Sequence, residues 1–489
     1  MSWTPLVLFR RLPPVPRLLL ASELAFNIGF YLVVPFLAVH LTQDLALAGS
    51  VVGLVLGVRT FSQQGLFFLG GGLADRFGVK PVVVVGVTVR IVGFAVLALT
   101  TSLAGVLAGT VLVGFAAALF SPAVESALAA QGSALEAAGV ATRAEVFGLD
   151  AIASRLGSVT GPVLGAVLLA VPFAVTCWVA AGVFGLVLLA HVRWLPGDVR
   201  TEGALEGGVR ESVMAGWGHV LRNRTFLAFT ACYCTYLLSY NQLYLALPVE
   251  LTRATGSQGA LGWLFVLAAI SVVVCQLRIT ARARRAGPRR ALPFGFGLMA
   301  ASFALVAVCA PLAPPPGPWA LAPAVGMVLL LCLGQMVAVP MAQDLVPRLA
   351  GERRLGAHFG FLASAGGLAV LVGSTGIGAL LDRAAQPGPA AALPWLVLAV
   401  LPALSAVGLW LITRRIDRAP GAVPSGAGRA RRGARQPVTA RPGRPSGLRA
   451  GPGPGTRVHG LLRAPMPGVG TTSCPAPGAA RPPRQRPSP

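Results

Sequence analysis

The chain has 489 residues, of which 55% are hydrophobic and only 11% are charged, and its mean hydropathy is +0.73. This composition excludes an ordinary soluble globular protein and indicates an integral membrane protein. The net charge of +24 does not indicate a nucleic-acid partner, because fifteen arginines lie from Arg414 onward, beyond the last apolar run.

Apolar runs of the length that a helix needs to cross a bilayer recur along the chain. Each run mixes Val, Ile and Ala with scattered Gly and Pro, as spanning helices do, and the alternating polarity of transmembrane strands is not seen. The sequence therefore predicts an all-α integral membrane protein with twelve transmembrane helices. The predicted spans are residues 18–41, 51–72, 81–100, 102–122, 148–171, 173–194, 226–248, 261–280, 291–311, 319–340, 358–381 and 394–413.

Basic residues gather in alternate connections between these spans. One set of connections holds 20 arginines and lysines, whereas the other set holds only Arg253 and Arg383. By the positive-inside rule, both termini are expected in the cytoplasm. The thirty-nine arginines against one lysine, beside many Ala, Gly and Pro, indicate a GC-rich bacterial genome, so we expect the chain to cross a bacterial inner membrane many times. The first span is too long for the core of a signal peptide, so we expect it to remain as a helix.

The two halves of the chain resemble each other. Phe147 and Gly148 match Phe359 and Gly360 at a spacing of 212 residues. A parallel repeat of six plus six helices is one architecture of secondary transporters, and it places the site between the halves. The predicted organisation is an N-terminal six-helix bundle at 1–195, a central cytoplasmic loop at 196–225, a C-terminal six-helix bundle at 226–414 and a tail at 415–489.

The tail is rich in Pro, Gly and Arg without periodicity, which indicates a disordered cytoplasmic segment. It either contacts anionic lipids or has no specific role. Six of the seven cysteines fall inside spans as small apolar residues, so no disulfide framework is implied. We expect no metal and no cofactor, because His and Cys do not occur at ligand spacing.

Two local motifs stand out. The stretch GGLADRFGVK, residues 71–80, places charges and glycines between two long apolar runs, and its glycines permit a sharp turn and close helix approach. Any cytoplasmic loop needs positive charge, but Asp75 can also cap a helix start or pair with a base. In the fifth span, Gly157, Gly161 and Gly165 form a flat face for close packing, and Pro162 adds a bend.

Both motifs resemble the major facilitator superfamily. Residues 71–80 match its pattern G-x-L-A-D-R-x-G-x-K between helices 2 and 3, with Val79 where an arginine is usual. Residues 157–166 are similar to the helix-5 pattern G-x-x-x-G-P-x-x-G-G of its drug:proton antiporters, with Ala166 in place of the last glycine. The resemblance covers residues 18–414 and omits the tail.

The resemblance implies two pseudo-symmetric six-helix bundles that exchange a small-molecule substrate for protons across the lipid bilayer. It also implies that the loop between helices 2 and 3 latches the halves in one conformation. The helix-4 motif of many antiporters departs here, because Thr110 and Val113 stand where arginine and glutamine are usual. The implied gating residues are Gly71, Asp75, Arg76, Gly78 and Lys80, and the implied antiporter motif is Gly157, Gly161, Pro162 and Gly165.

Polar residues inside spans are expensive to insert and indicate sites by default. In the first span, Glu23, Asn27 and Tyr31 follow one helical face. A carboxylate partly removed from water is easier to protonate, so Glu23 is a candidate for proton coupling or for binding a cationic substrate. The alternative is a residue near the headgroups that points to water or pairs with Arg17.

Arginines also lie within the second, third and fifth spans, at Arg59, Arg90 and Arg155. Arg59 and Gln63 share one face of the second span. Arg59 could replace the missing helix-4 base by pairing with a carboxylate, or it could serve as a structural pair between helices. Six residues near span ends are expected at solvated boundary positions. These are Glu125, Asp150, His191 and Asp344 toward the cytoplasm, and Glu250 and Asp382 on the other side.

All five tyrosines lie on the first and seventh spans, which occupy equivalent places in the two halves. The seventh-span set keeps to one side of the helix and extends through its middle, which favours cavity lining over an interfacial belt. Such rings suit aromatic or cationic drugs. The cavity candidates are Asn27, Tyr31, Gln63, Tyr233, Tyr236, Tyr240 and Gln335.

Together these features predict a monomeric secondary active transporter and not an enzyme. The favoured function is proton-coupled efflux of drugs or amphipathic molecules by alternating access. A proton-coupled importer of a small metabolite is the alternative. A membrane enzyme or lipid-handling protein is a third reading, disfavoured because the five histidines are scattered among loops and span ends.

Overall fold

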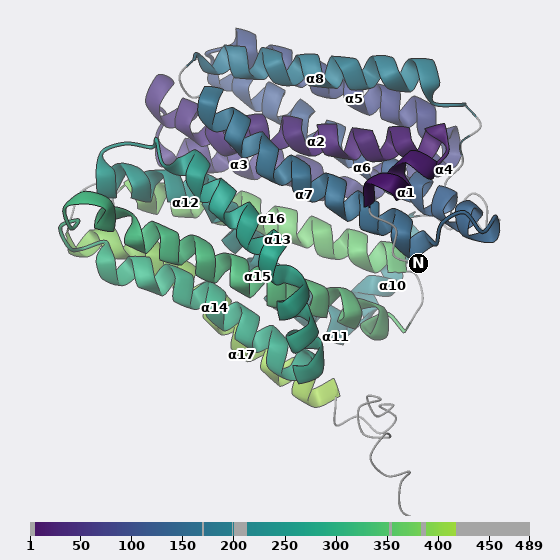
Figure 1. Cartoon of the computed structure of the whole chain (residues 1–489). Coiled ribbons are helices and arrows are strands. Elements are labelled where there is room, and N and C mark those ends of the chain that lie inside the picture. The colour runs from purple at the N-terminus through teal and green to yellow at the C-terminus, as the bar shows by residue number, and fades with distance from the viewer. Residues whose placement is uncertain are drawn as a thin grey trace, which may run out of the picture. The chain divides into compact units, whose positions relative to one another are not determined.

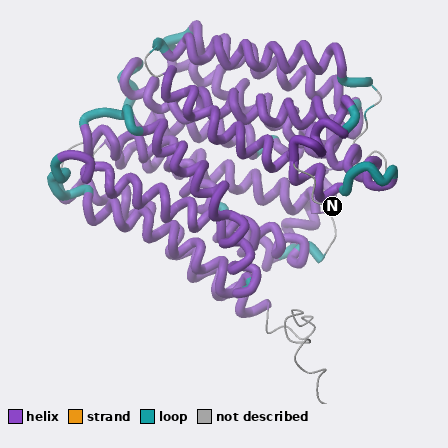
Figure 2. Tube along the Cα trace, in the orientation of Figure 1, coloured by secondary structure: helices purple, strands orange, loops and turns teal. Residues whose placement is uncertain are grey.

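The computed structural model describes residues 5–168, 171–197, 199, 213–351, 355–382 and 388–416. Most of the predicted central loop and all of the predicted tail after residue 416 lie outside the described residues. Inside described helices, the side chains of residues 5, 68, 71, 72, 75, 213–217 and 416 are also outside them. The described chain consists of helices joined by loops (Figures 1 and 2).

The first half contains a short helix, α1, and the helices that match the first six spans. Their bounds are Pro5–Arg11 (α1), Pro14–Val39 (α2), Gly49–Gln64 (α3), Phe67–Phe77 (α4), Val79–Leu99 (α5), Leu103–Ala137 (α6), Arg143–Leu168 (α7) and Phe173–Trp194 (α8). A single π-helical turn, η1, continues α2 over His40–Asp44.

The second half begins with α10, which precedes the helices of the last six spans. The bounds are Val213–Arg222 (α10), Arg224–Tyr233 (α11), Thr235–Thr255 (α12), Leu261–Ala286 (α13), Pro288–Cys309 (α14), Ala322–Leu349 (α15), Leu355–Leu381 (α16) and Leu393–Ile416 (α17). Short 3₁₀ turns at Gly317–Leu321 (η2) and Pro389–Ala392 (η4) precede α15 and α17.

Each predicted span coincides with one helix or with two consecutive helices. Within the described ranges, ten helical segments are individually long and apolar enough to cross a bilayer. The other two spans are broken: α3 and α4 form the second, and α11 and α12 form the seventh. The break after α3 occurs at Gly65, whose carbonyl accepts a hydrogen bond of 3.1 Å from the Ser364 hydroxyl. Serine side chains commonly satisfy such freed carbonyls in membranes.

The largest departure from the predicted boundaries is in the fourth span. The prediction ends at residue 122, whereas α6 continues through Pro122 to Ala137. Proline is tolerated inside membrane helices when neighbouring groups satisfy the freed backbone. Glu125 therefore lies within a long helix and not beyond its end.

The helices pack as two six-helix bundles that meet along a seam. In the first bundle α2 packs on α7, and α5 packs on α6 and α8; in the second, α14 packs on α15 and α17. The seam is formed chiefly by α3 against α16 and by α7 against α13. In Figure 1 the purple and blue helices of the first bundle lie beside the green helices of the second.

Candidate functional site

Three cavities follow the seam from one end to the other. We call the end that holds Arg76 and Arg290 the arginine-rich end, and the end that holds η1 and Asp382 the opposite end. A cavity of about 240 Å³ lies at the opposite end between Leu47 and Val249. A cavity of about 210 Å³ lies toward the arginine-rich end beside Gln64.

The central cavity between these two is small. Its volume is about 40 Å³, room for little more than a water molecule, whereas drug-sized ligands occupy roughly 300–1,000 Å³. Side chains from both bundles line it. They include the predicted Tyr31, Tyr240 and Gln335, together with Arg155 and Ser158. The seam is therefore closed at its middle in this conformation.

The tyrosines of the seventh span form a continuous ladder along α11 and α12. Ring centroids are 5.5 Å apart for Tyr233 and Tyr236, 6.4 Å for Tyr236 and Tyr240, and 6.0 Å for Tyr240 and Tyr244. The ladder links two of the cavities, because Tyr233 and Tyr236 line the one beside Gln64 and Tyr240 lines the central one. Their roles in substrate binding remain predictions.

Glu23 and Asn27 interact as their spacing on α2 requires. The Asn27 amide donates to the Glu23 carboxylate at 2.7 Å and to the Glu23 carbonyl at 2.9 Å. Glu125 on α6 and Asp150 on α7 supply two further carboxylates, and both helices pack on α2. Within the described residues, none of the three carboxylates forms an ion pair with a basic side chain. We call these three residues the acidic cluster.

Glu125 is exposed and Asp150 is half-buried, as expected for boundary positions, but both lie on helices that pack against the helix of Glu23. The continuation of α6 beyond Pro122 carries Glu125 along the bundle, and the packing of α7 on α2 brings Asp150 to the same place. Sequence reasoning missed that the helical pattern continues beyond Pro122, which places Glu125 inside α6.

Arg59 is buried on α3, with 4% of its surface exposed. Its Nη2 donates to Gln63 Oε1 at 2.6 Å, and its guanidinium lies 4.6 Å from the centre of the Phe30 ring. No carboxylate in the described part of the chain pairs with it, so the anticipated ion pair is not formed. Next to it, the Thr60 hydroxyl donates to Asn241 at 3.0 Å and joins the two bundles.

Arg90 on α5 is a second buried cation, to which sequence reasoning gave no role. It is 2% exposed and lies 4.8 Å from the Phe184 ring centre, 5.4 Å from that of Phe120 and 5.6 Å from that of Phe94. Its Nε and Nη2 atoms have no hydrogen-bond partner within the described residues. Burial of a charged guanidinium costs free energy, and here only the aromatic faces offset that cost.

The glycine face of α7 packs on the polar face of α2. A methyl group added at Gly157 would lie 2.5 Å from Asn27 Cβ, and one added at Gly161 would lie 2.6 Å from Tyr31 Cβ. The third glycine, Gly165, packs against Phe36. Only glycine permits this approach, so the motif fixes where Asn27 and Tyr31 stand. Pro162 on the same helix lines the central cavity.

A second glycine face, which sequence reasoning overlooked, lies on α3. Gly49, Gly53 and Gly57 have the same four-residue spacing and contact α16 across the seam. At the end of this contact, Asp382 accepts hydrogen bonds from the amides of Gly49 at 2.6 Å and Ser50 at 3.4 Å. Asp382 is exposed as expected, but it also caps the start of α3.

The loop between α4 and α5 is tight. Gly78 joins the two helices with φ of +86°, a conformation that favours glycine. Lys80 Nζ donates to the Val192 carbonyl of α8 at 3.0 Å, within the same bundle. The Arg76 guanidinium lies 5.2 Å from the Phe77 ring centre. Gly71 lies within α4, and the side chain of Asp75 lies outside the described residues.

Two other residues expected at solvated boundaries are buried. Glu250 is 1% exposed and forms a two-point pair with Arg253, at 2.7 and 2.8 Å. The reason is that α12 continues to Thr255, beyond the predicted end of the span. His191 is fully buried on α8, where its Nδ1 lies 2.8 Å from the Val187 carbonyl.

Known proteins with similar sequences are named MFS-type transporters or multidrug resistance proteins. The Major Facilitator Superfamily profile matches residues 19–374 and 229–451. The MFS-type transporter Rv0849 of Mycobacterium tuberculosis is 38% identical over 390 residues, which cover 77% of this chain and 88% of the relative. Multidrug resistance protein MdtH of Aeromonas hydrophila is 31% identical over 403 residues, covering 82% of this chain and 94% of the relative.

Solved structures share the fold at low sequence identity. The nucleoside transporter NupG superposes with a TM-score of 0.65 at 14% identity, covering 82% of this chain and all of that chain. The peptide transporter POT in complex with sulfate has a TM-score of 0.66 at 15% identity, covering 85% of this chain and 99% of that chain. The chain therefore belongs to the Major Facilitator Superfamily and is a multi-pass membrane transporter.

Proposed function

We propose that the protein is a proton-coupled antiporter that exports amphipathic, aromatic or cationic small molecules. The observation that carries this proposal is a ladder of tyrosine rings along the seam together with an acidic cluster that has no basic partner within the described residues. Tyrosine faces attract organic cations, and carboxylates without a cationic partner are free to take up either a proton or a cation.

The relatives support export as the direction. MdtH, at 31% identity, is named a multidrug resistance protein. The likeness to nucleoside and peptide transporters lies below the identity at which substrates transfer, so it supports the fold alone. The tyrosine rings along the seam also suit an aromatic, amphipathic substrate.

In the proposed mechanism, proton and substrate compete for the acidic cluster. Glu23, Glu125 and Asp150 repel one another when all are charged, so uptake of one proton or one cationic substrate relieves the repulsion. Neutralisation on one side of the membrane favours release of the substrate there, and the bundles rock about the seam between the two states. A single chain supplies both bundles, so the proposed transporter acts as a monomer.

The orientation is part of the same proposal. The arginine-rich end faces the cytoplasm of a bacterial inner membrane, with both termini on that side. Glu23, Glu125 and Asp150 then take up a substrate from the inside, and the opposite end opens to release it. Cysteine-accessibility labelling at Arg76 and Gln43 in intact cells tests this directly, because only Gln43→Cys is expected to react with a membrane-impermeant maleimide.

The decisive experiment follows ethidium transport in proteoliposomes with an imposed proton gradient. We expect the wild-type protein to move ethidium against its gradient only while the proton gradient persists, and Glu23→Gln to lose at least 10-fold in rate, typical of removing a group that transfers a proton. Glu136→Gln, an exposed carboxylate outside the cluster, is the matched control and should retain the wild-type rate. Transport that ignores the proton gradient would refute antiport.

A further inference from the structure

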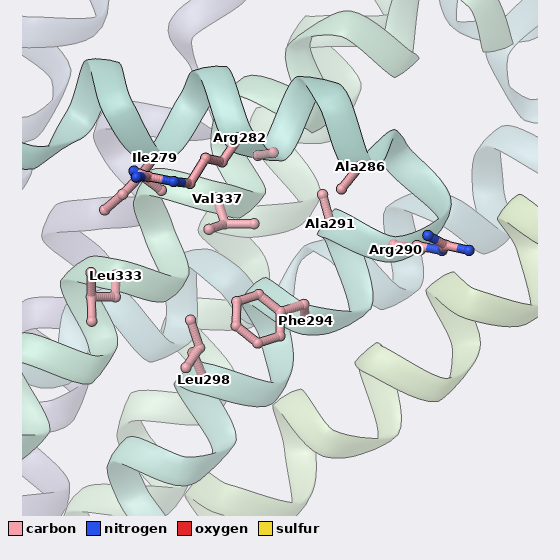
Figure 3. A pocket seen from close by; sticks show the side chains of 10 residues that line it. Ile279, Arg282, Ala286, Arg290, Ala291, Phe294, Leu298, Leu333 and Val337 are labelled. Atoms are coloured by element: carbon pink, nitrogen blue, oxygen red, sulfur yellow. The ribbon is translucent and has the colours of Figure 1, made fainter. Parts of the chain in front are cut away.

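A large groove lies on the second bundle, away from the seam. It has a volume of about 500 Å³ and runs between α13, α14 and α15 near the arginine-rich end. Figure 3 shows it between the end of α13 and the start of α14. Among the described elements, α14 makes its main contacts with helices of its own bundle, so the groove is separate from the transport route.

The walls of this groove are apolar except for two arginines. Phe294 and Leu298 come from α14, and Leu333 and Val337 come from α15. The remaining lining residues are Ile279, Arg282, Ala283, Ala286, Arg290 and Ala291. An apolar groove of this size is large enough to hold a substantial part of an acyl chain.

The surface around the groove is one that lipid covers in a membrane. Leu277 is 82% exposed, Phe294 is 61% exposed and Val274 is 58% exposed. Exposed apolar side chains on a spanning helix face hydrocarbon, and they leave the groove open to lipid.

The two arginines give the groove a chemical preference. Arg282 and Arg290 are exposed, and neither guanidinium forms a hydrogen bond or an ion pair within the described residues. Figure 3 shows them on opposite walls, with Arg282 extending toward Ile279 and Arg290 toward the other end of the groove. Basic pockets between helices at this depth attract lipid phosphates.

We propose that this groove binds an anionic phospholipid from the leaflet at the arginine-rich end. An acyl chain lies along Phe294, Leu298, Leu333 and Val337, while the phosphate stays at the rim, where the positive charges of both arginines attract it. The occupant is a lipid because the groove opens to the membrane, and it is anionic because both rim charges are positive. One wall of the groove is formed by α13, which also packs on α7 across the seam. In the proposed transport cycle, the bound lipid therefore lies against a helix that moves.

The test is native mass spectrometry of the full chain in a neutral detergent, titrated with dioleoyl phosphatidylglycerol or dioleoyl phosphatidylcholine. We expect tighter binding of phosphatidylglycerol. The double variant Arg282→Gln with Arg290→Gln should weaken it roughly 30-fold, which corresponds to about 1 kcal/mol for each arginine near a lipid phosphate.

A matched control separates a site from general surface charge. Arg278→Gln with Arg285→Gln removes two charges from α13, the helix of Arg282, without touching the groove, and should weaken binding less than about 3-fold. The tail is present in every variant, so lipid held by the tail would survive the Arg282 and Arg290 substitutions. An equal loss in both double variants, or no loss in either, overturns the proposal.

A second variant tests the apolar part of the groove. Ala286→Trp fills the mouth from an exposed helical position, where a large side chain is compatible with folding. We expect it to reduce retention of both lipids while thermal stability stays unchanged. Undiminished retention of phosphatidylglycerol by Ala286→Trp would place the lipid elsewhere and overturn the proposal. None of these measurements requires transport, so they stand or fall independently of the antiport mechanism.

Discussion

Two helices carry the same spacing of three glycines and use it differently. On α7 the glycines pack against α2 inside one bundle, whereas on α3 they pack against α16 across the seam. The first contact is expected to persist through the transport cycle, and the second has to separate for a substrate to pass. Four-residue glycine spacing therefore predicts close approach, but not whether the contact belongs to the fold or to the gate.

The largest expected effect comes from filling the contact on α7. Gly161→Leu places a branched side chain against Tyr31 and the Ile28 carbonyl, where the surrounding bundle cannot move away. Overpacking in a rigid core costs roughly 1–3 kcal/mol and more when backbone is struck. We expect a clear fall in the thermal unfolding temperature and loss of transport together. A thermal scan in detergent measures the first, and an unchanged melting temperature would show that this contact also opens.

Filling the contact on α3 should shift the equilibrium between the closed and separated bundles more than it lowers thermal stability. Gly53→Leu strikes the Ser374 carbonyl on α16, and the bundles relieve this clash by separating at the opposite end. A cost of about 1–3 kcal/mol to the closed state shifts the equilibrium by roughly 5–150-fold. We expect transport to be lost while the melting temperature falls less than in Gly161→Leu. Spin labels at Gln43→Cys and Ala390→Cys, in a background without the native cysteines, should report a longer distance.

The sequence predicts the contacts within a helix better than those between helices. Helical spacing placed Glu23 beside Asn27 and Arg59 beside Gln63, because residues four apart share a face. It could not place Glu125 with Glu23, which requires knowing that α6 and α7 pack on α2. The interruptions at Gly65 and Cys234 were also invisible, since the apolar pattern continues through both.

The apolar runs predict the number of membrane crossings well, because a chain in hydrocarbon has few alternatives to a helix of about 20 residues. The same reasoning misjudged polar residues near predicted ends. Glu250 and His191 were assigned to water, yet both are buried: Glu250 pairs with Arg253 on the longer helix α12, and His191 contacts Ser22 of α2. A boundary error of one or two turns is enough to move a charged group from solvent into the protein.

A smaller effect is expected at the end of the α3 contact. Asp382→Ala removes the carboxylate that caps α3 across the seam, and the loss of such a cap costs about 0.5–2 kcal/mol. We expect a longer distance between labels at Gln43 and Ala390, by a smaller population shift than in Gly53→Leu. Asp382→Asn keeps an acceptor oxygen and should give an intermediate shift. Identical behaviour of the two Asp382 variants would mean that the cap does not hold the seam.

The smallest effect is expected toward the other end of the same helix pair. Ser364→Ala removes the hydroxyl of α16 that donates to the Gly65 carbonyl, at a net cost of about 1 kcal/mol. This contact ties α16 to the break between α3 and α4, so its loss loosens the arginine-rich end and leaves the opposite end closed more of the time. The labels at Gln43 and Ala390 should therefore move closer on average, opposite in sign to Asp382→Ala. If both substitutions shift the distance in the same direction, α3 and α16 separate as a single unit and do not rock about a pivot between their ends.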